Sequence, residues 1–221
     1  MCGRLNLHNS PLILRMLSSL GIDLFPERPP RYNIAPTSML DVVVSAHDLR
    51  AMQWSIEFGK FRHPNTKVET IHRKPHLEKL LLAQRCIVPV NRFYEWPDPK
   101  VRPQWMGIKT RFCIHTPDDV LFLGGIYKRN EAGVDQVNIL TTDPTEAISE
   151  FHHRMPVIVA PRNVGEWLNT DAVNDLYALA APYRDELIIY PCDSYVDNAR
   201  HQGPQCMAAL GDPEFGLGLH V

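Results

Sequence analysis

The sequence lacks the features that would place it in a membrane, a secretion route or a repeat architecture. No uninterrupted apolar stretch in its 221 residues approaches the length of a membrane span. The N-terminus has no basic segment followed by an apolar core, which a secretory signal requires. Internal repeats and low-complexity segments are also missing. We therefore expect a cytoplasmic protein that does not associate with membranes.

Cysteines are too few and too irregularly spaced for a disulfide framework. There are five, at positions 2, 86, 113, 192 and 206, and no pair of them forms a Cys-x-x-Cys zinc motif. We expect the last four to be inert packing residues. The histidines form no metal-binding pattern either, because His72 and His76 are separated by Pro75, and His152 and His153 are adjacent rather than on one helical face. We expect no metal and no cofactor.

The charges are distributed unevenly along the chain. Residues 1–130 hold 19 Lys+Arg and 11 Asp+Glu, whereas residues 131–221 hold 4 and 14. A basic N-terminal part within a nearly neutral total suggests a face that binds a polyanion. Attraction between the two parts within one fold explains the same counts equally well. The hydrophobic fraction of 44% is enough for a substantial core, and we expect one domain over residues 1–221.

The periodicity predicts an α+β protein with a mostly antiparallel sheet, because successive strands are joined by polar turns rather than by helices. Ser10 is a helix N-cap candidate, Arg31 to Thr37 is predicted to be an ordered loop, and the tail after Arg200 is irregular. Helices are expected at 10–20, after Pro75, between 143 and 151, and at 163–169 and 171–181. Strands are expected at 39–44, 51–58, 86–90, 112–116, 120–127, 137–142, 157–159 and 187–190.

Cys2 becomes the N-terminal residue if the initiator methionine is removed. It would then carry an α-amine and a thiol on adjacent carbons, with reference pKa values of about 8 and 8.5. An aldehyde condenses with the amine to an imine, and the thiolate then closes a five-membered thiazolidine. Alternatively, the thiolate attacks an acyl carbon with the amine as its base. A third reading is that Cys2 is an ordinary second residue without a role.

Two other stretches carry residues suited to chemistry or binding. In the stretch from Asn91 to Trp96, Glu95 lies among three aromatic residues, so partial desolvation would raise its pKa and suit it to general acid catalysis. An exposed Glu on an amphipathic strand fits the alternation equally well. Lysines and arginines between Lys60 and Lys79, with Phe58 and Phe61 beside them, suit a strand of nucleic acid. A solvated basic surface is the other interpretation.

Five motifs together resemble one family. They are Met1-Cys2-Gly3-Arg4, Arg31-Tyr32-Asn33-Ile34-Ala35-Pro36, Asn65-Thr66-Lys67-Val68-Glu69-Thr70, Phe93-Tyr94-Glu95-Trp96 and His152-His153-Arg154-Met155-Pro156. Their order and spacing, from Cys2 to about Asn198, are similar to those of the SOS-response-associated peptidase (SRAP) family, whose members crosslink covalently to abasic sites in single-stranded DNA.

The resemblance implies a fold, an activity and roles for individual residues. It implies a barrel-like sheet core with flanking helices. It also implies a sensor that traps the abasic aldehyde on Cys2 as a thiazolidine after self-removal of Met1, protects the lesion during the DNA damage response, and has a crosslink-reversal (lyase) activity. Asn65 would orient the amine or the opened sugar, Glu95 would move protons, and His152 would protonate or bind the sugar hydroxyl. His153 would be structural.

The same resemblance implies the partner and its contacts. The partner would be single-stranded DNA containing an abasic site, bound by a monomer that is cytoplasmic and associated with the nucleoid when on DNA. The residues expected to contact phosphates or flanking nucleotides are Arg4, Asn33, Pro36, Lys67, Thr141 and Arg154.

The sequence departs from the family pattern at three places. Lys67 replaces the usual Arg, so a bidentate phosphate fork becomes a point charge. Arg92 replaces a Gly before the aromatic-Glu-Trp motif, which adds a charge near the expected cleft and disfavours positive φ. Ser55 follows Trp54 where the family has Trp-Gly-x-x-Pro.

Two other functions are compatible with parts of the sequence. Class II glutamine amidotransferases also begin Met-Cys-Gly and use the freed Cys as a nucleophile. In that family, however, an Ile follows where this chain has Arg4, and an Asn-Gly pair forms the oxyanion site, whereas this chain has no Asn-Gly dipeptide. A noncatalytic single-strand-binding module would explain the basic stretch but not Glu95 or Cys2.

Overall fold

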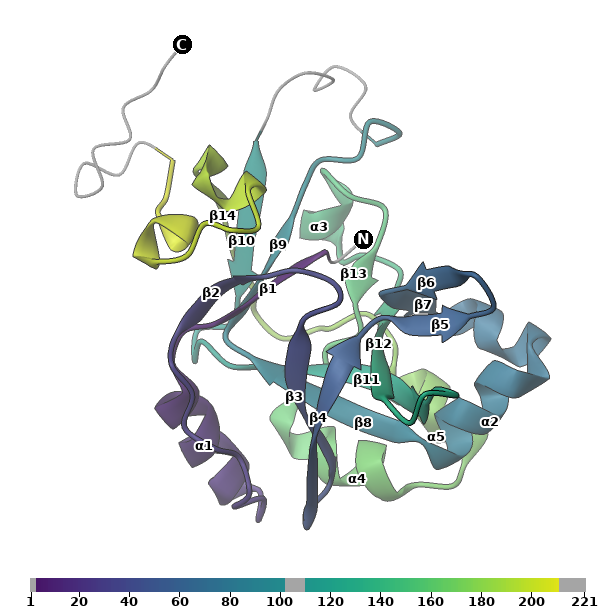
Figure 1. Cartoon of the computed structure of the whole chain (residues 1–221). Coiled ribbons are helices and arrows are strands. Elements are labelled where there is room, and N and C mark those ends of the chain that lie inside the picture. The colour runs from purple at the N-terminus through teal and green to yellow at the C-terminus, as the bar shows by residue number, and fades with distance from the viewer. Residues whose placement is uncertain (1–2, 102–109, 211–221) are drawn as a thin grey trace.

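In the part of the chain that the structure describes, two large β-sheets and one two-stranded sheet are surrounded by short helices (Figure 1). The computed structural model describes residues 3–101 and 110–210. Among the helices of these residues, none is both long enough and apolar enough to cross a membrane.

The larger sheet closes into a five-stranded barrel. Its strands are β3 (Met39–Ser45), β4 (Asp48–Trp54), β8 (Arg85–Val90), β11 (Leu121–Arg129) and β12 (Asp135–Thr142), in the order β11-β8-β3-β4-β12. Pairing between β11 and β12 completes the ring, and every pair in it is antiparallel except β4 with β12. The expectation of an α+β fold with a mostly antiparallel, barrel-like core is confirmed.

Strand β12 also carries two short strands beyond the ring. β7 (Asn65–Lys67) pairs with it in parallel, and β13 (Met155–Pro156) pairs with it in antiparallel orientation. Thr141 lies opposite Lys67 on one side and opposite Pro156 on the other. Strand β12 thus brings together two segments that are far apart in the chain, since Thr66 and Pro156 are separated by 90 positions.

The second sheet is antiparallel throughout. Its order is β14-β10-β9-β1-β2, where β14 is Ile188–Cys192, β10 is Arg111–His115, β9 is Arg92–Glu95, β1 is Arg4–Leu7 and β2 is Arg31–Ile34. The prediction that this last segment is a loop was wrong. A polar strand is stable at this edge because its buried Asn33 amide donates to the carbonyls of Val196 and Asn198.

Short helices and one hairpin flank the sheets. The expected helix after Ser10 forms, but its cap is Asn9, whose Oδ1 accepts the Leu12 N–H at 3.2 Å. A left-handed Gly21 with φ of +77° follows its end. The remaining elements are α1 (Ser10–Ser19), β5 (Ile56–Phe58), β6 (Phe61–His63), α2 (Pro75–Ala83), α3 (Glu146–Ser149), α4 (Val164–Asn169) and α5 (Val173–Leu179), with 3₁₀ turns η1 (Val68–Arg73), η3 (Pro161–Asn163), η4 (Ser194–Asp197) and η5 (Pro204–Met207).

Buried indoles stabilise the barrel through packing and hydrogen bonds. The side chains of Trp54 and Trp167 are fully buried. Each indole N–H donates to a backbone carbonyl. The Trp54 indole donates to Pro64 O at 2.9 Å, and the Trp167 indole donates to Cys86 O at 3.0 Å. These bonds satisfy the only polar atom of each ring, so the large apolar surface is buried without leaving a donor unpaired.

Ser55 connects β4 to β5 with a strained backbone. Its φ is +114°, in a region that favours glycine, and its N–H donates to Val137 O at 2.9 Å in β12. The position is also 2% exposed, so the surrounding core holds it in place. The replacement of the family's Gly by Ser therefore puts strain at a barrel junction.

We expect Ser55→Gly to raise the free energy of unfolding by about 1 kcal/mol, because glycine adopts this φ without a steric penalty. The matched control is Ala51→Gly in β4, an exposed strand position with ordinary φ, which should lower the stability by about 0.5–1 kcal/mol. Urea unfolding of both variants provides the measurement. A loss of stability at Ser55 similar to that at Ala51 would contradict the strain.

Candidate active site and nucleic-acid interface

Alternation along β9 directs Glu95 into the protein. Side chains at Arg92 and Tyr94 project from one face of the strand, and those at Phe93 and Glu95 from the other. Arg92 Nε donates to Asp119 Oδ1 at 2.8 Å and its Nη1 donates to the Tyr190 hydroxyl at 2.7 Å. The extra charge of Arg92 is therefore neutralised on the opposite face from Glu95, and not added to the cleft as expected.

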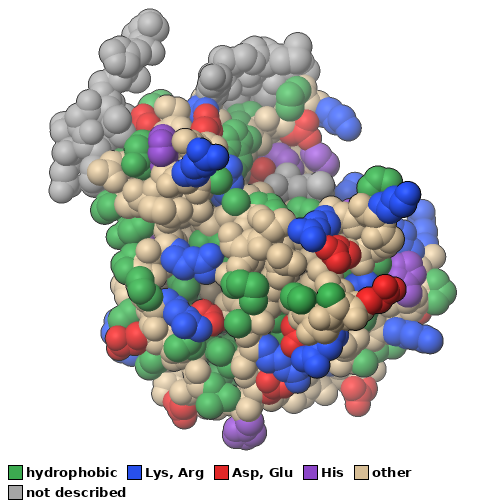
Figure 2. All heavy atoms as spheres, in the orientation of Figure 1, with side chains coloured by type: hydrophobic (Ala, Val, Ile, Leu, Met, Phe, Trp, Pro, Cys, Tyr) green, Lys and Arg blue, Asp and Glu red, His purple; other side chains and the backbone are tan. Residues whose placement is uncertain are grey.

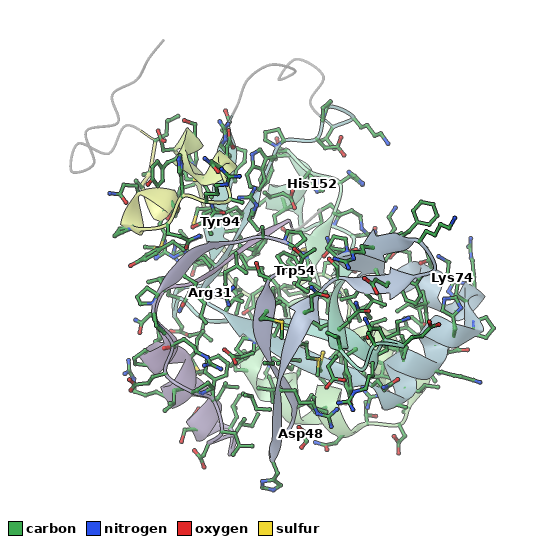
Figure 3. The ribbon with its side chains drawn as sticks, viewed as in Figure 1. Arg31, Asp48, Trp54, Lys74, Tyr94 and His152 are labelled. Carbon is green, nitrogen blue, oxygen red and sulfur yellow. The ribbon has the colours of Figure 1, made fainter. Side chains whose placement is uncertain are left out.

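Glu95 is 2% exposed, so the alternative of a carboxylate on an open strand face was wrong. Burial raises its pKa to about 7. Its Oε1 lies 3.6 Å from Nε2 of His152, which is 4% exposed (Figure 3). Burial lowers the pKa of that imidazole to about 4. At neutral pH this pair consists of a neutral histidine and a carboxyl group that both gives and accepts a proton.

The segment after α3 holds the His152 ring by its other nitrogen. Nδ1 lies 2.8 Å from the carbonyl oxygen of Arg154 and 3.0 Å from its backbone nitrogen, so it donates to the carbonyl in one tautomer and accepts from the N–H in the other. The Asp98 N–H, just beyond β9, donates to Phe151 O at 2.8 Å. The strand end that carries Glu95 and the loop that carries His152 are thereby joined.

Asn65 comes from a third element. It starts β7 opposite Ile139 of β12. The end of β12 also pairs with β13, which directly follows the His152 segment. A second link is the ion pair between Glu69, in η1, and Arg154. The fold therefore joins the segment of Asn65 to that of His152 through β12 and through this ion pair.

Cys2 lies outside the described residues. Strand β1 begins at Arg4 opposite Tyr94, which is one residue before Glu95 in β9. The other four cysteines are free and buried, as expected. Burial raises the pKa of each of their thiols above its ordinary value, so none of them is a ready nucleophile.

Comparison with known proteins identifies the family. The model of the family described as SOS response associated peptidase (SRAP) matches residues 1–199.

The chain belongs to the SRAP family.

Curated SRAP relatives extend over nearly the whole chain. The abasic site processing protein YoqW of Bacillus subtilis is 30% identical, covering 93% of this chain and 98% of its own. The abasic site processing protein YoaM of the same organism is 29% identical, covering 95% of this chain and 98% of its own. The abasic site processing protein HMCES of Xenopus tropicalis is 24% identical over 82% of this chain and 66% of its own.

Solved structures share the SRAP fold. A Bacteroides thetaiotaomicron protein superposes with a TM-score of 0.74 at 18% identity, covering 93% of this chain and 99% of its own. A phage-related protein of Bordetella bronchiseptica superposes with a TM-score of 0.69 at 23% identity, covering 91% of this chain and 99% of its own. These likenesses concern the fold.

Arg4 and Asn33, two of the expected DNA contacts, bind each other. Arg4 Nη1 donates to Asn33 Oδ1 at 2.8 Å and to Val196 O at 3.1 Å. Its guanidinium also lies 5.8 Å from the centre of the Trp96 ring. Asn33 is 2% exposed, so it orients Arg4 rather than presenting its own amide to solvent.

The other expected contacts differ in their access to solvent. Lys67 is exposed and Pro36 is half-buried. Thr141 is fully buried, and Arg154 is 3% exposed. Sequence position gave no indication of this difference, because all of these residues belong to motifs or strands expected near the groove.

A basic surface surrounds Lys67. Figure 2 shows Lys and Arg side chains along the right-hand edge of the molecule, over the β5–β6 hairpin and α2. Phe61, at the end of this hairpin, is 71% exposed. The exposed cations of this surface are Lys60, Arg62, Lys67, Arg73, Lys74 and Lys79.

One group near the site offers metal-ligand atoms. Asp98, His152 and His153 each provide an atom within 4.8 Å of the others. The two imidazoles, however, stack at 22° with centroids 4.9 Å apart, so their in-plane lone pairs do not converge on one point. Asp98 instead forms an ion pair with His153. Sequence analysis missed Asp98, which is distant from the histidines in the chain.

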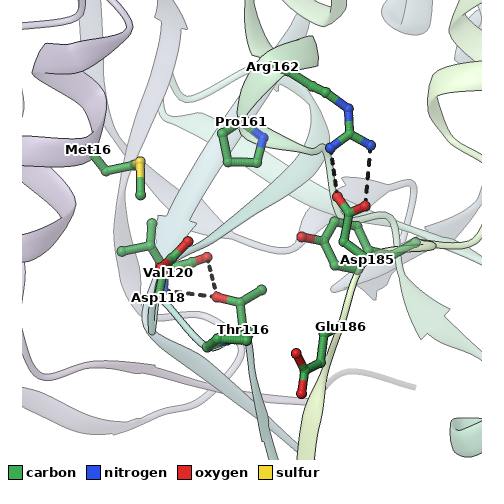
Figure 4. Close-up of a pocket in the computed structure, with 10 residues that line it drawn as sticks. Met16, Thr116, Asp118, Val120, Pro161, Arg162, Asp185 and Glu186 are labelled. Carbon is green, nitrogen blue, oxygen red and sulfur yellow. Dashed lines mark hydrogen bonds and ion pairs between the residues drawn. The ribbon is translucent and has the colours of Figure 1, made fainter.

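A cavity of about 380 Å³ lies elsewhere, between α1, the β10–β11 turn and the segment after α5 (Figure 4). Arg162 donates to Asp185 there at 2.8 Å, while Asp118 and Glu186 also line the wall. With three carboxylates and one paired cation, this cavity repels a polyanion.

Glu95→Gln should stabilise the protein above pH 7 and have no stabilising effect below about pH 4.5. A buried carboxyl whose pKa rises to about 7 loses stability as pH increases through that value, by up to about 3 kcal/mol in total. His152 and Asp98 remain in the variant, so the difference contains the titration of Glu95 together with the change that its removal makes in these two neighbours. Urea unfolding of both proteins from pH 4 to 9 measures it. If the difference in unfolding free energy between the two proteins did not change with pH, the raised pKa of buried Glu95 would be contradicted.

Proposed function

We propose that this protein captures abasic sites in single-stranded DNA by forming a covalent bond through Cys2. Membership of the SRAP family and the printed descriptions of its curated relatives support this function. The single observation that carries it is the buried Glu95 beside neutral His152, at the place where β1 begins. Such a pair serves a reaction that needs both proton donation and proton acceptance near neutral pH.

The proposed reaction proceeds from the open-chain sugar, which is an aldehyde. The α-amine of Cys2 adds to the carbonyl carbon, and the carbinolamine loses water to give an imine. The thiol sulfur then adds to the imine carbon and its proton moves to nitrogen, which closes the thiazolidine. Protonated Glu95 donates to the departing hydroxyl, and neutral His152 accepts a proton from an attacking group or from the ring-opening sugar.

Further steps belong to the same proposal. Cys2 has a free amine only after hydrolysis of the Met1–Cys2 bond, and Glu95 is the proposed base for this self-cleavage. Protonation of the thiazolidine sulfur by the same pair would open the ring to the imine, and addition of water to the imine carbon would then return free Cys2 and the aldehyde, which is the proposed lyase activity. Asn65 orients the amine or the opened sugar through its amide.

The proposed DNA path follows the basic surface. Lys67, exposed and opposite Thr141 of β12, is proposed to bind a phosphate next to the lesion. Arg4, held by Asn33, is proposed as the second cation, with Pro36 packing against a flanking nucleotide. Buried Thr141 supports Lys67 from the neighbouring strand.

Protein with a native N-terminus should form a denaturant-resistant adduct with an abasic oligonucleotide, because a thiazolidine survives denaturation. Denaturing electrophoresis and intact mass measurement detect the shifted band, the loss of Met1 and the mass of the adduct. Cys2→Ala should abolish the adduct, and Cys86→Ala, which alters a buried thiol, should leave its yield unchanged.

Equal yield from the Cys2→Ala variant would reject the proposal. An adduct with an acyl donor instead of the abasic oligonucleotide would favour an N-terminal-nucleophile amidohydrolase.

Lys67→Ala should weaken binding to single-stranded DNA and reduce the slope of log K against log salt by about 0.7, the value for one phosphate contact. Arg15→Ala is the control, because Arg15 is an exposed cation on α1, away from β7 in Figure 1. Fluorescence anisotropy over a salt series, with an oligonucleotide that carries a tetrahydrofuran abasic analogue, gives both slopes. An unchanged slope for the Lys67 variant would contradict the contact.

A further inference from the structure

Both terminal nitrogens of the Arg154 guanidinium donate hydrogen bonds to other groups of the protein. Nη1 and Nη2 donate to the two oxygens of Glu69, each at 2.7 Å. Nη1 also donates to Asp143 Oδ1 at 3.0 Å, and Nη2 donates to Thr141 O at 2.7 Å. This bidentate arrangement is the geometry in which Arg pairs most strongly with a carboxylate. Although partial burial raises the pKa of Glu69, hydrogen bonds from Arg154 hold it below its ordinary value.

The carboxylates lie on the outside of this cluster. The side chain of Arg154 is 4% exposed, whereas those of Glu69 and Asp143 are 48% and 81% exposed. Glu69 therefore holds the guanidinium from its solvent side, and without it the guanidinium keeps its bonds to Asp143 and to the carbonyl of Thr141.

The backbone of the same arginine holds His152. Its carbonyl oxygen and nitrogen lie 2.8 and 3.0 Å from Nδ1, and the opposite nitrogen of the ring faces Glu95 at 3.6 Å. A shift of the Arg154 backbone therefore changes both the direction of Nε2 and the balance between its tautomers.

Glu69 determines where that backbone lies. It belongs to η1, which begins directly after β7, the strand of Asn65 and Lys67. Because two hydrogen bonds fix the Glu69 carboxylate against the buried guanidinium, the pair couples the position of this segment to that of the His152 loop.

We propose that Glu69 is a positioning residue for His152, acting through the side chain and backbone of Arg154. The effect on crosslinking rests on the proposed function, whereas the effect on the His152 ring does not. Removal of the Glu69 charge therefore has opposite effects on two steps. It removes a negative charge beside Lys67, which favours DNA binding, and it releases the His152 loop, which slows the reaction.

The test compares Glu69→Gln with Asp143→Asn in the full chain with a native N-terminus. Asp143→Asn removes the same charge from the same guanidinium but only one 3.0 Å contact. We expect Glu69→Gln to slow single-turnover crosslinking of an abasic oligonucleotide by about tenfold to a hundredfold, as for a misplaced reacting group. Affinity for the tetrahydrofuran oligonucleotide should stay equal or increase. Asp143→Asn should change the rate less than threefold.

Two further readouts separate positioning from general destabilisation. The midpoint of the pH–rate profile should shift in Glu69→Gln, and the ¹⁵N chemical shifts of His152 in DNA-free protein should change. The charged and titratable groups around that ring, Glu95, Asp98, His153 and Arg154, are the same in both variants. Glu69→Asp keeps the charge on a side chain that is one methylene shorter, so its crosslinking rate and its His152 shifts should lie between those of the parent protein and Glu69→Gln. This variant takes the place of Glu69→Gln if that variant does not fold.

Several outcomes would overturn the proposal. Faster crosslinking with tighter binding in Glu69→Gln would mean that Glu69 only repels DNA. A parallel loss of rate and of affinity for the tetrahydrofuran oligonucleotide would make the cluster a DNA-binding element. If the parent protein formed no adduct, the proposed function would fail, and unchanged ¹⁵N shifts of His152 would then separately reject its positioning by Glu69.

Discussion

The burial of one carboxyl group, that of Glu95, constrains the surrounding structure more than any other interaction. Ionising it in a water-excluded position is costly, so its pKa rises to about 7. The same burial keeps the neighbouring imidazole of His152 neutral. A site of this kind needs close packing from all sides, and the molecule provides it by ending β9, starting β1 and folding the loop after α3 at one place.

The barrel gives this arrangement its rigidity. Strand β12 belongs to the closed ring, and its C-terminal end pairs with β7 on one side and β13 on the other. A displacement of either short strand breaks ladder hydrogen bonds that the ring holds in register. The ion pair of Glu69 and Arg154 adds a second, charged connection between the same two segments, and loss of Glu69 would leave the buried guanidinium paired with the largely exposed Asp143.

The uneven charge distribution has both of the explanations that composition left open. Some cations of the N-terminal part bind acidic residues of the C-terminal part, as Arg111 does with Asp197 and Arg129 with Asp135. Others remain exposed on the surface around Lys67. Residue counts cannot separate these two groups, because solvent exposure depends on which strands become neighbours.

The sequence by itself determined the local features: most strand and helix positions, the apolar cysteines and the five motifs of the family. These features depend on contacts between residues close in the chain, or on residue types. It failed for β2, whose polar Asn33 is stable in a strand only because carbonyls near residue 197 accept its amide protons. Only the tertiary structure decided that Glu95 faces His152, that Arg154 is covered by Glu69, and that Lys67 remains open to solvent. Each of these facts depends on the register of strands far apart in the sequence, which short-range patterns do not encode.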